Sequence, residues 1–211
     1  MSQALALIAH DLKNALGSLE AELAAMACLP SPEAHREASQ QAHHHCQALR
    51  QEFVQFLTLY AAEAGELRPL CEDESPQALL DALVSHWRSR LATEGRDIRL
   101  IAHTADTAPP FWYFDRRLLR LALDAAVHNA TRFARTTVQL SCSVSEGGLR
   151  FTITDDGPGL QSGATDARTS TGLGTALSQA VAKAHTLGAQ CGHVSLTDHP
   201  AGGACFTLWL P

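Results

Sequence analysis

Hydrophobic residues recur every three or four positions over the first 26 residues, with polar residues between them. This spacing predicts an amphipathic helix with a single apolar stripe. The stripe consists of Leu5, Ile8, Leu12, Leu16, Leu19, Leu23 and Met26. His10 and Asn14 fall on the opposite side of the helical wheel, and because they are four positions apart they share one face.

A second amphipathic pattern follows Pro30 and Pro32, which cannot continue the first helix. Its apolar face contains Leu49, Phe53, Phe56, Leu57 and Tyr60. Gly65 is expected to end the helix. Two antiparallel helices with one apolar stripe each cannot bury both stripes alone. The pattern therefore predicts a helical hairpin that forms a dimeric four-helix bundle with a second copy.

The patterning changes beyond this hairpin. Ser75-Pro76 is typical of a helix N-cap and first helical residue, and the helix is expected to run to about Leu91. Two further helices are predicted, from Asp115 to about Ala134 and over Gly174–Leu187. Strand-like runs are found at Ile98–Ala102, Phe111–Phe114, Val138–Val144 and Leu149–Thr154, and two more end the chain.

Ser145-Glu146-Gly147-Gly148 separates two of these strands and predicts a β-hairpin. Because helices and strands do not alternate regularly, we expect an α+β sandwich in which helices cover one mixed sheet. The predicted organisation is a helical hairpin over residues 1–65, a linker over residues 66–75, and a second domain over residues 76–211.

Composition narrows the classes of protein that fit. The formal net charge of −6, with no basic tract, argues against a nucleic-acid partner. No apolar run is long enough for a membrane span and no secretory signal is present, so we expect a cytoplasmic protein. The six cysteines lack metal-like spacing. His43-His44-His45 resembles a metal tract, but consecutive helical residues point in different directions, which argues against one shared ion.

Three segments of the second domain combine residue types suited to nucleotide chemistry. They are Val127–Phe133 within a helix, Thr154–Leu160 after a strand, and Ser170–Leu177 entering a helix. A glycine-rich entry to a helix offers backbone N–H groups and a favourable dipole to phosphate. The Asn129 side-chain carbonyl suits Mg²⁺, and a carboxylate at a strand end can accept a hydrogen bond from an amino group such as that of adenine. Taken singly, the same segments also fit a solvated helix face, a turn and a helix start.

The order of the motifs resembles that of the two-component sensor histidine kinases over nearly the whole chain. The motifs are His10-Asp11-Leu12-Lys13-Asn14, the Asn129 helix, Asp155–Gly159, Gly172–Gly174 and Gly202–Leu208. The resemblance implies a dimerisation and phosphoacceptor hairpin, followed by the ATP-binding domain of the gyrase, Hsp90 and histidine kinase superfamily. It implies an ATP-dependent protein-histidine kinase, a transferase of two-component signal transduction.

The resemblance also implies the roles of individual residues. His10 would be the phosphoacceptor, and Asp11 would hydrogen-bond its ring and act as the base. Asn14 would position water for dephosphorylating a response regulator. The implied partners are a second copy of the chain, a response-regulator receiver domain and, since only nine residues precede His10, a separate sensor protein.

ATP and Mg²⁺ are the implied cofactors. Asn129 would be the Mg²⁺ ligand, Asp155 would bind the adenine amino group, and Arg132 would reach the phosphates. The other residues that the resemblance assigns to the nucleotide site are Phe133, Gly157, Gly159, Gly172, Leu173 and Gly174.

The chain also departs from the family pattern. Ala125 stands where relatives carry an Asn or an acid one turn before the Mg²⁺ ligand, and Asp124 is one residue off. The segment between Gly159 and Gly172 is short and lacks phenylalanine, and Ala15 replaces a helix-kinking proline. Ala125 and the short segment favour an alternative, a histidine phosphotransfer or scaffold protein with weak or no ATP turnover. A phosphatase-biased kinase acting through Asn14 is compatible with the kinase hypothesis.

Overall fold

The computed structural model describes residues 3–27, 31–104, 108–160 and 173–211. The chain divides into two compact units, Met1–Leu67 and Arg68–Pro211. The division falls inside the segment that the sequence predicts as a linker. None of the described helices is long and apolar enough to cross a membrane.

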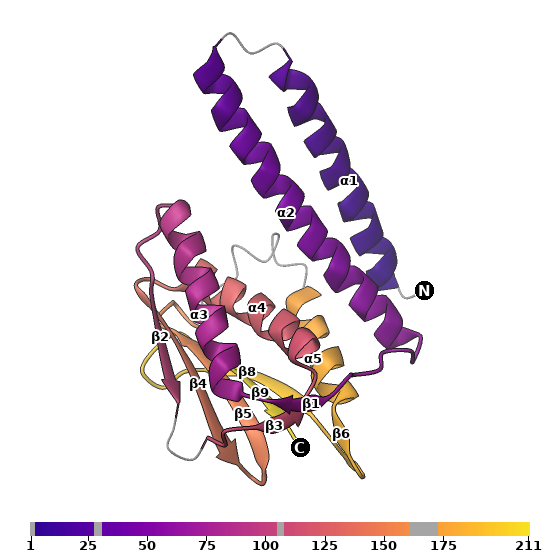
Figure 1. The fold of residues 1–211 in the computed structure, drawn as a ribbon, viewed down its shortest axis with the longest axis vertical. Helices are drawn as coiled ribbons and strands as arrows, with labels where there is room; N and C mark the ends of the chain where they lie inside the picture. Colours follow the sequence, from indigo (N-terminus) through magenta and orange to yellow (C-terminus); the bar gives the residue numbers. More distant parts are fainter. Residues whose placement is uncertain (1–2, 28–30, 105–107, 161–172) are drawn as a thin grey trace. The chain divides into compact units, whose positions relative to one another are not determined.

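The first unit is a helical hairpin of α1 (Gln3–Met26) and α2 (Pro32–Glu63), shown in Figure 1. The Ser31 hydroxyl accepts a hydrogen bond from the Ala34 N–H at 3.2 Å and so caps α2. At the other end Gly65 adopts a φ of 70°, and the N–H groups of residues 65 and 66 bond back to the last turn. This left-handed termination confirms Gly65 as the stop signal. The α1 helix runs unbroken through Ala15.

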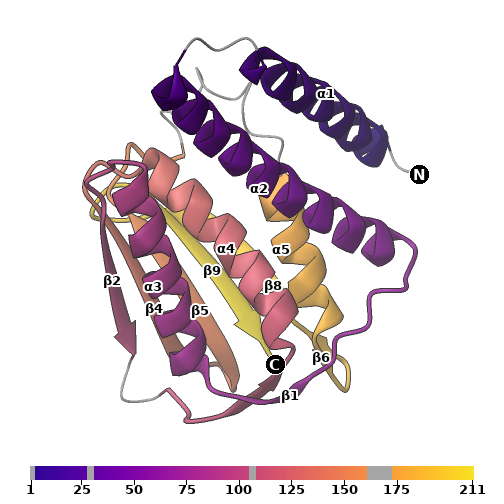
Figure 2. The ribbon, with the colours of Figure 1, turned by 45° about the horizontal axis from the view of Figure 1, so that its top comes forward.

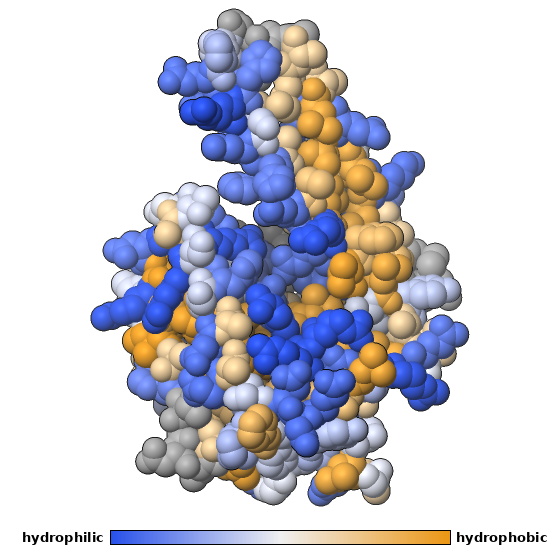
Figure 3. Space-filling view, viewed as in Figure 1, coloured by the Kyte–Doolittle hydropathy of each residue, from blue (hydrophilic) through white to orange (hydrophobic). Residues whose placement is uncertain are grey.

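Among the hairpin side chains that the structure describes, only a few apolar ones are buried. Leu12 of α1 is 8% exposed, and Ala42, Leu49 and Leu59 of α2 are also buried. The apolar side chains with about half of their surface exposed are Leu16, Leu23, Phe53, Leu57 and Tyr60. Figure 3 shows hydrophobic residues gathered along one side of the hairpin, with hydrophilic residues on the other. The hairpin by itself leaves the predicted apolar faces partly open to solvent.

The second unit is built on a five-stranded sheet in the order β2-β4-β5-β9-β8. Neighbouring strands are antiparallel except for the parallel pair β2–β4, so the sheet is mixed. The strands are β2 (Arg99–Thr104), β4 (Thr137–Ser145), β5 (Gly148–Asp155), β8 (His193–Asp198) and β9 (Ala204–Leu210). Together with the helices below, this confirms the predicted α+β fold with one mixed sheet covered by helices and a helical hairpin before it.

Three helices cover one face of this sheet: α3 (Pro76–Thr93), α4 (Arg116–Phe133) and α5 (Leu173–Ala184), as Figure 2 shows. Their inward side chains and alternate residues of the central strands form the core. Leu79, Leu119, Leu123, Leu140 and Phe151 are each 0% exposed. This alternation along β5 places residues 149, 151, 153 and 155 on the helix side of the sheet.

Local signals account for several element boundaries. Ser75 caps α3 as predicted, accepting from the Ala78 N–H at 3.3 Å. Asp115 caps α4 by accepting from the Leu118 N–H at 3.0 Å. The predicted β4–β5 hairpin is present. Its two-residue turn has φ of 56° and 75° at Glu146 and Gly147, the combination that matches the twist of the flanking strands.

Two segments depart from the predicted elements. β1 (Glu72–Glu74), within the expected linker, pairs with β3 (Trp112–Phe114) in a two-stranded antiparallel sheet. The predicted helix over Gly174–Leu187 is wrong at its end, because α5 stops at Ala184 and β6 (Thr186–Leu187) then pairs with β7 (Gln190–Cys191).

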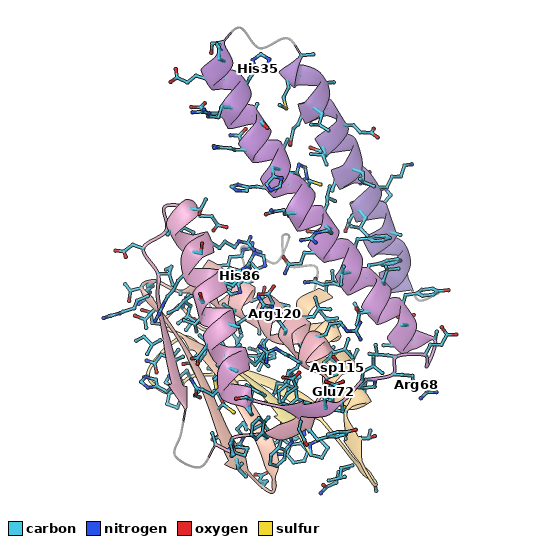
Figure 4. The ribbon with its side chains drawn as sticks, viewed as in Figure 1. His35, Arg68, Glu72, His86, Asp115 and Arg120 are labelled. Atoms are coloured by element: carbon cyan, nitrogen blue, oxygen red, sulfur yellow. The ribbon has the colours of Figure 1, made fainter. Side chains whose placement is uncertain are left out.

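Contacts of a buried histidine explain why α5 stops there. The His185 ring is 4% exposed. Its Nδ1 lies 2.8 Å from the Val181 carbonyl, and its Nε2 accepts from the Asp115 N–H at 3.1 Å. Asp115, labelled in Figure 4, lies at the beginning of α4. The ring thus ties the end of α5 to a distant part of the chain.

Candidate functional site

The first candidate group lies on α1 of the hairpin. The His10 side chain is 66% exposed. Asn14 Nδ2 lies 3.1 Å from His10 Nδ1, within hydrogen-bond distance. Asp11 Oδ1 is 3.7 Å from the same nitrogen, too far for a hydrogen bond. A helix stacks residues four apart and turns adjacent residues about 100° away, so Asn14 contacts the ring more closely than Asp11 does.

The neighbouring histidines of α2 are engaged separately. His43 Nε2 lies 2.8 Å from the Gln47 side-chain nitrogen on the same helix. His45 Nδ1 is 3.1 Å from both carboxylate oxygens of Glu22, and so connects α2 to α1. Among the described residues, no group of three or more His, Cys, Asp or Glu could hold a metal ion.

The second candidate group lines a cavity of about 250 Å³ in the second unit. Side chains from α4, α5 and strands β5, β8 and β9 contribute to its walls. Predicted site residues that line it are Asn129, Phe133, Asp155, Gly159 and Gly174. Most of the remaining lining is apolar, as in typical small-molecule sites, and includes Ile153, Leu196 and Phe206. The cavity volume lies just below the roughly 300–1,000 Å³ usual for ligand pockets, which suits a flat ring better than a whole nucleotide.

Asp155 is a buried carboxylate at the end of β5, 8% exposed. Its Oδ1 accepts from the Gly157 N–H at 2.8 Å and from the Ala204 N–H at 3.3 Å. These two bonds fix the carboxylate and come from segments far apart in the sequence. Within the described part of the chain, Oδ2 makes no hydrogen bond, so this oxygen is available to a donor in the cavity.

The loop after β5 passes close to other backbone. A Cβ at Gly157 would lie 2.5 Å from the Phe133 carbonyl oxygen, so this position has no room for a side chain. Gly159 has a φ of 81°, in the left-handed region that favours glycine. Asp198 Oδ1, at the end of β8, accepts from the Leu160 N–H at 2.6 Å. Asp198 therefore holds the loop that forms one wall of the cavity.

Asp156 holds the turn after α4 and does not line the cavity. Its Oδ1 accepts from the Arg135 and Thr136 N–H groups at 2.8 and 3.0 Å, and its Oδ2 accepts from the Thr136 hydroxyl at 2.5 Å. Burial would raise its pKa, but these hydrogen bonds prevail and hold it well below its usual range. The carboxylate thus anchors the turn after α4, which carries Phe133.

The exposed end of α4 carries the other predicted nucleotide contacts. Asn129 is exposed, and within the described part of the chain its side chain makes no hydrogen bond. The Arg132 guanidinium lies over the Phe133 ring, 5.2 Å from its centroid. Phe133 is 39% exposed. Its ring therefore offers a surface on which a planar base can stack.

One turn before Asn129, α4 has no ligand directed at the cavity. Ala125 is 4% exposed and apolar. The neighbouring carboxylate, Asp124, accepts from the Trp87 Nε1–H of α3 at 2.7 Å. The His128 ring stacks against the same Trp87 at 5.9 Å between centroids. Asp124 thus belongs to the α3–α4 interface, and α4 presents only Asn129 as an oxygen ligand.

The first turn of α5 completes the cavity. Leu173 is buried, and Gly174 lines the cavity beside Asn129. Gly172 lies outside the described residues, as does most of the short segment between it and Gly159. Thr175 and Ser178 also line the cavity. The Ser178 hydroxyl is used internally, since it donates to the Gly174 carbonyl at 2.9 Å and to the Ala122 carbonyl at 3.2 Å.

The fold therefore brings Asn129, Phe133, Asp155, Gly159 and Gly174 to one cavity in the second unit, while His10, Asp11 and Asn14 lie on the hairpin. Sequence reasoning did not single out Asp198 or Thr175. The signal for Thr175 was its place directly after the glycine-rich segment. Asp198 had no local signal, because its partner is 38 residues away in the chain.

Comparison with known proteins shows which family the second unit is similar to. Residues 114–211 match the family described as histidine kinase-, DNA gyrase B- and HSP90-like ATPase. These residues include α4, α5, the strands β4, β5, β8 and β9, and the whole described cavity. This part of the second unit is therefore similar to the ATPase domains of this family.

Individual relatives narrow this class. The sensor histidine kinase CpxA of Escherichia coli K12 is 30% identical over 125 residues, covering 51% of this chain and 26% of CpxA. The chain thus matches about a quarter of the length of that relative. The Acinetobacter baumannii histidine kinase AdeS shares the fold with a TM-score of 0.73 at 22% identity, covering 95% of this chain and 96% of the AdeS chain.

Full-length ShkA, solved in complex with AMPPNP, has a TM-score of 0.68 at 21% identity, covering 99% of this chain and 45% of the ShkA chain. Together, the family match and these likenesses support a histidine kinase catalytic core that carries an ATP-binding domain.

Proposed function

We propose that this chain autophosphorylates His10 from Mg-ATP and passes the phosphoryl group to an aspartate of a response-regulator receiver domain. The observation that carries the proposal is the cavity of the second unit. It combines a fixed, buried carboxylate, Asp155, with an exposed amide, Asn129, on a domain of the histidine kinase-like ATPase family. An exposed imidazole on a separate helical hairpin supplies an acceptor for the phosphoryl group.

Different residues of the cavity would hold different parts of the nucleotide. The free Asp155 oxygen is placed to accept from an adenine amino group, and Phe133 offers a face for the base. The nucleotide site assigned by resemblance also includes Arg132, Gly157, Gly159, Gly172, Leu173 and Gly174. Catalysis of phosphoryl transfer is mainly positioning and neutralisation of charge, and these residues supply the positioning.

The donor set also fits Mg²⁺. The exposed Asn129 amide is not engaged by other described side chains, and its oxygen is a hard donor of the kind that Mg²⁺ prefers. Mg²⁺ keeps several waters and is commonly held by one or two protein ligands plus substrate phosphates, so a single protein oxygen is compatible with it. When bound, the ion would neutralise phosphate charge.

On the hairpin, His10 is the nucleophile of the proposed reaction. In the observed contact the Asn14 side-chain N–H donates to Nδ1, which places the proton of a neutral ring on Nε2. Attack by Nε2 requires the other tautomer, in which Nδ1 carries the proton. Bonding through the amide oxygen of Asn14 would stabilise that tautomer. Asp11, at 3.7 Å, is close enough to stabilise a charged imidazole and to act as the base after a small rotation. In a separate phosphatase reaction, Asn14 would position water for dephosphorylating the regulator.

The proposed partners follow from the hairpin. Its half-exposed apolar side chains favour a homodimer, in which a second hairpin completes a four-helix bundle. The receiver domain of a response regulator is the other proposed partner, and the cytoplasm is the proposed location.

A second function is favoured by one observation. Because Ala125 carries no ligand and Asp124 is bound to Trp87, the metal end of the site is poorer than the family pattern implies. A histidine phosphotransfer or scaffold protein, relaying phosphate through His10 with little ATP turnover, would need no such site.

The test is incubation of the chain with γ-labelled ATP and Mg²⁺. Acid-labile label is expected on the parent chain and is expected to vanish in His10→Ala and in Asn129→Ala. His10→Ala should still bind nucleotide, because His10 is not part of the cavity. His35→Ala, which changes another exposed histidine of the hairpin, is the matched control and should label like the parent. A parent chain that binds no nucleotide and is never labelled would favour the relay function.

A further inference from the structure

The two-stranded ribbon of β1 and β3 lies at the lower end of the second unit in Figure 1, outside the five-stranded sheet. One of its faces is anchored to the rest of the unit. Phe114 is 0% exposed, and its ring packs edge-on to Phe151 at 6.4 Å between centroids. The Trp112 Nε1–H donates to the Pro211 carbonyl at 3.3 Å. The ribbon is therefore a fixed part of this surface.

The opposite face of the ribbon presents two side chains to solvent. Asp73 of β1 and Tyr113 of β3 are directly opposite each other in the strand register. Such pairs have Cβ atoms about 5 Å apart on the same face. Asp73 is exposed and Tyr113 is 66% exposed. Within the described part of the chain, neither side chain makes a hydrogen bond, an ion pair or a ring contact.

A carboxylate beside an exposed aromatic ring matches the side chain of arginine. The planar guanidinium can donate two parallel N–H bonds to a carboxylate and also lie on an aromatic face. A lysine ammonium is a point charge and lacks this fork. Glu74 is already paired with Arg116 at 3.1 Å. Glu72 and Asp73 are exposed acids without a described partner, so the strand attracts a cation and repels anionic partners.

The β1 strand also has an open edge. It pairs with β3 on one side only, and outside that pairing no described backbone hydrogen bond involves residues 72–74. An open edge can accept an extended segment as a further strand. A second copy of this chain is a poor occupant, because pairing two β1 strands would set acidic residues against acidic residues. The charge of β1 therefore favours a basic partner segment.

We propose that the β1–β3 ribbon binds an extended, arginine-bearing segment of another protein. The segment adds to the edge of β1 and places one arginine on the Asp73–Tyr113 pair. The guanidinium bonds to the Asp73 carboxylate, and the side chain covers the Tyr113 ring. This binding requires neither the nucleotide cavity nor His10.

The probe is a fluorescein-labelled heptapeptide of alternating valine and arginine, and its binding to the full chain is measured by fluorescence anisotropy. Asp73→Asn keeps the size of the side chain and removes its charge. We expect it to bind the peptide about fivefold more weakly, the upper range for an exposed ion pair. Tyr113→Leu should weaken binding about threefold through loss of the ring contact.

Matched peptides and a matched variant serve as controls. Peptides with citrulline or lysine in place of arginine should bind more weakly than the arginine peptide, since citrulline has no charge and lysine no fork. N-methylation of alternate amides keeps every side chain, removes the donors along one edge, and should also weaken binding. Glu37→Gln removes one exposed acid from the hairpin and should bind the arginine peptide like the parent. AMPPNP affinity and thermal unfolding should be unchanged in all three variants.

Each contrary result has a definite meaning. No binding of the arginine peptide to the parent overturns the proposal, as does equal binding to Asp73→Asn. An equal loss in Glu37→Gln would assign the effect to net charge, and equal binding of the lysine peptide would remove the assignment to arginine. Equal binding of the methylated peptide would overturn strand addition. Weaker self-association of Asp73→Asn in sedimentation would assign the ribbon to a second copy instead.

Discussion

The two units of this chain differ in how completely they bury their apolar side chains. In the second unit, Leu119 and Leu123 of α4 are 0% exposed, because a sheet and two other helices surround that helix. In the hairpin, Leu57 and Tyr60 of α2 remain 47% and 50% exposed. The second unit completes its own core, whereas the hairpin leaves an apolar face that a second copy can cover.

The functional residues follow the same division. Asn14 contacts His10 from four positions away on one helix, so that group is built from local geometry alone. The cavity of the second unit joins Asn129, Asp155 and Ala204, which belong to three separate elements. Its geometry therefore depends on tertiary packing. A substitution that disrupts the core of the second unit should therefore weaken nucleotide binding, whereas a substitution on the hairpin should not.

Leu123→Ala is expected to give the largest effect. Removing a fully buried leucine lowers the free energy of unfolding by about 2–5 kcal/mol, from lost apolar burial and the cavity left behind. Urea unfolding followed by tryptophan fluorescence measures it, because Trp87, Trp112 and Trp209 all lie in the second unit. AMPPNP affinity should fall along with stability.

Leu57→Ala is the matched variant on the hairpin. We expect it to leave tryptophan-detected unfolding and AMPPNP affinity unchanged, and to weaken self-association measured by sedimentation. A Leu57→Ala chain that associates as tightly as the parent would argue against this face as the dimer interface. A loss of second-unit stability would contradict the independence of the two units.

Asp198 tests how far the nucleotide site depends on long-range contacts. Asp198→Ala removes the acceptor for the Leu160 N–H, a loss worth about 1 kcal/mol for a typical hydrogen bond. AMPPNP affinity, measured by titration, should fall about fivefold because the loop wall loosens. Asp198→Asn keeps a side-chain oxygen and should recover most of the affinity. If Asn binds as weakly as Ala, the charge rather than the hydrogen bond matters.

The smallest effect concerns pH and the buried His185. Burial lowers the pKa of His185 below its ordinary value of about 6.5, although its bond to Val181 and the nearby Asp115 oppose this. The unfolded chain therefore binds more protons below that pH, and the second unit should lose stability as pH falls from 7 to 5.5. Burial lowers the pKa of His128 as well, which adds to the same trend.

Urea unfolding at the two pH values checks this expectation. His185→Gln should unfold at lower urea but show a smaller difference between pH 7 and pH 5.5. His103→Gln changes an exposed histidine of β2 and should keep the parent's difference. An unchanged difference in His185→Gln would show that the buried ring does not control the pH response.

Much of the fold was predictable because its signals are local. Ser75 and Asp115 cap helices, Gly65 ends α2, and Glu146-Gly147 forms the hairpin turn, each through bonds within a few residues. The end of α5 was not predictable, because it depends on the contact of His185 with Asp115, 70 residues away. The pairing of β1 with β3 was missed for the same reason.

The sequence by itself determined the elements and the identity of most candidate residues: an exposed His10 beside Asn14, the Asp155–Gly159 turn, and Asn129 on an amphipathic helix. Only the tertiary structure decided how they are used. It bonded Asp124 to Trp87, bonded Asp198 to the loop after β5, and placed Gly174 of α5 against Ala125 of α4. The physical reason is that helix and turn signals act over a few residues, whereas these contacts depend on how distant segments pack.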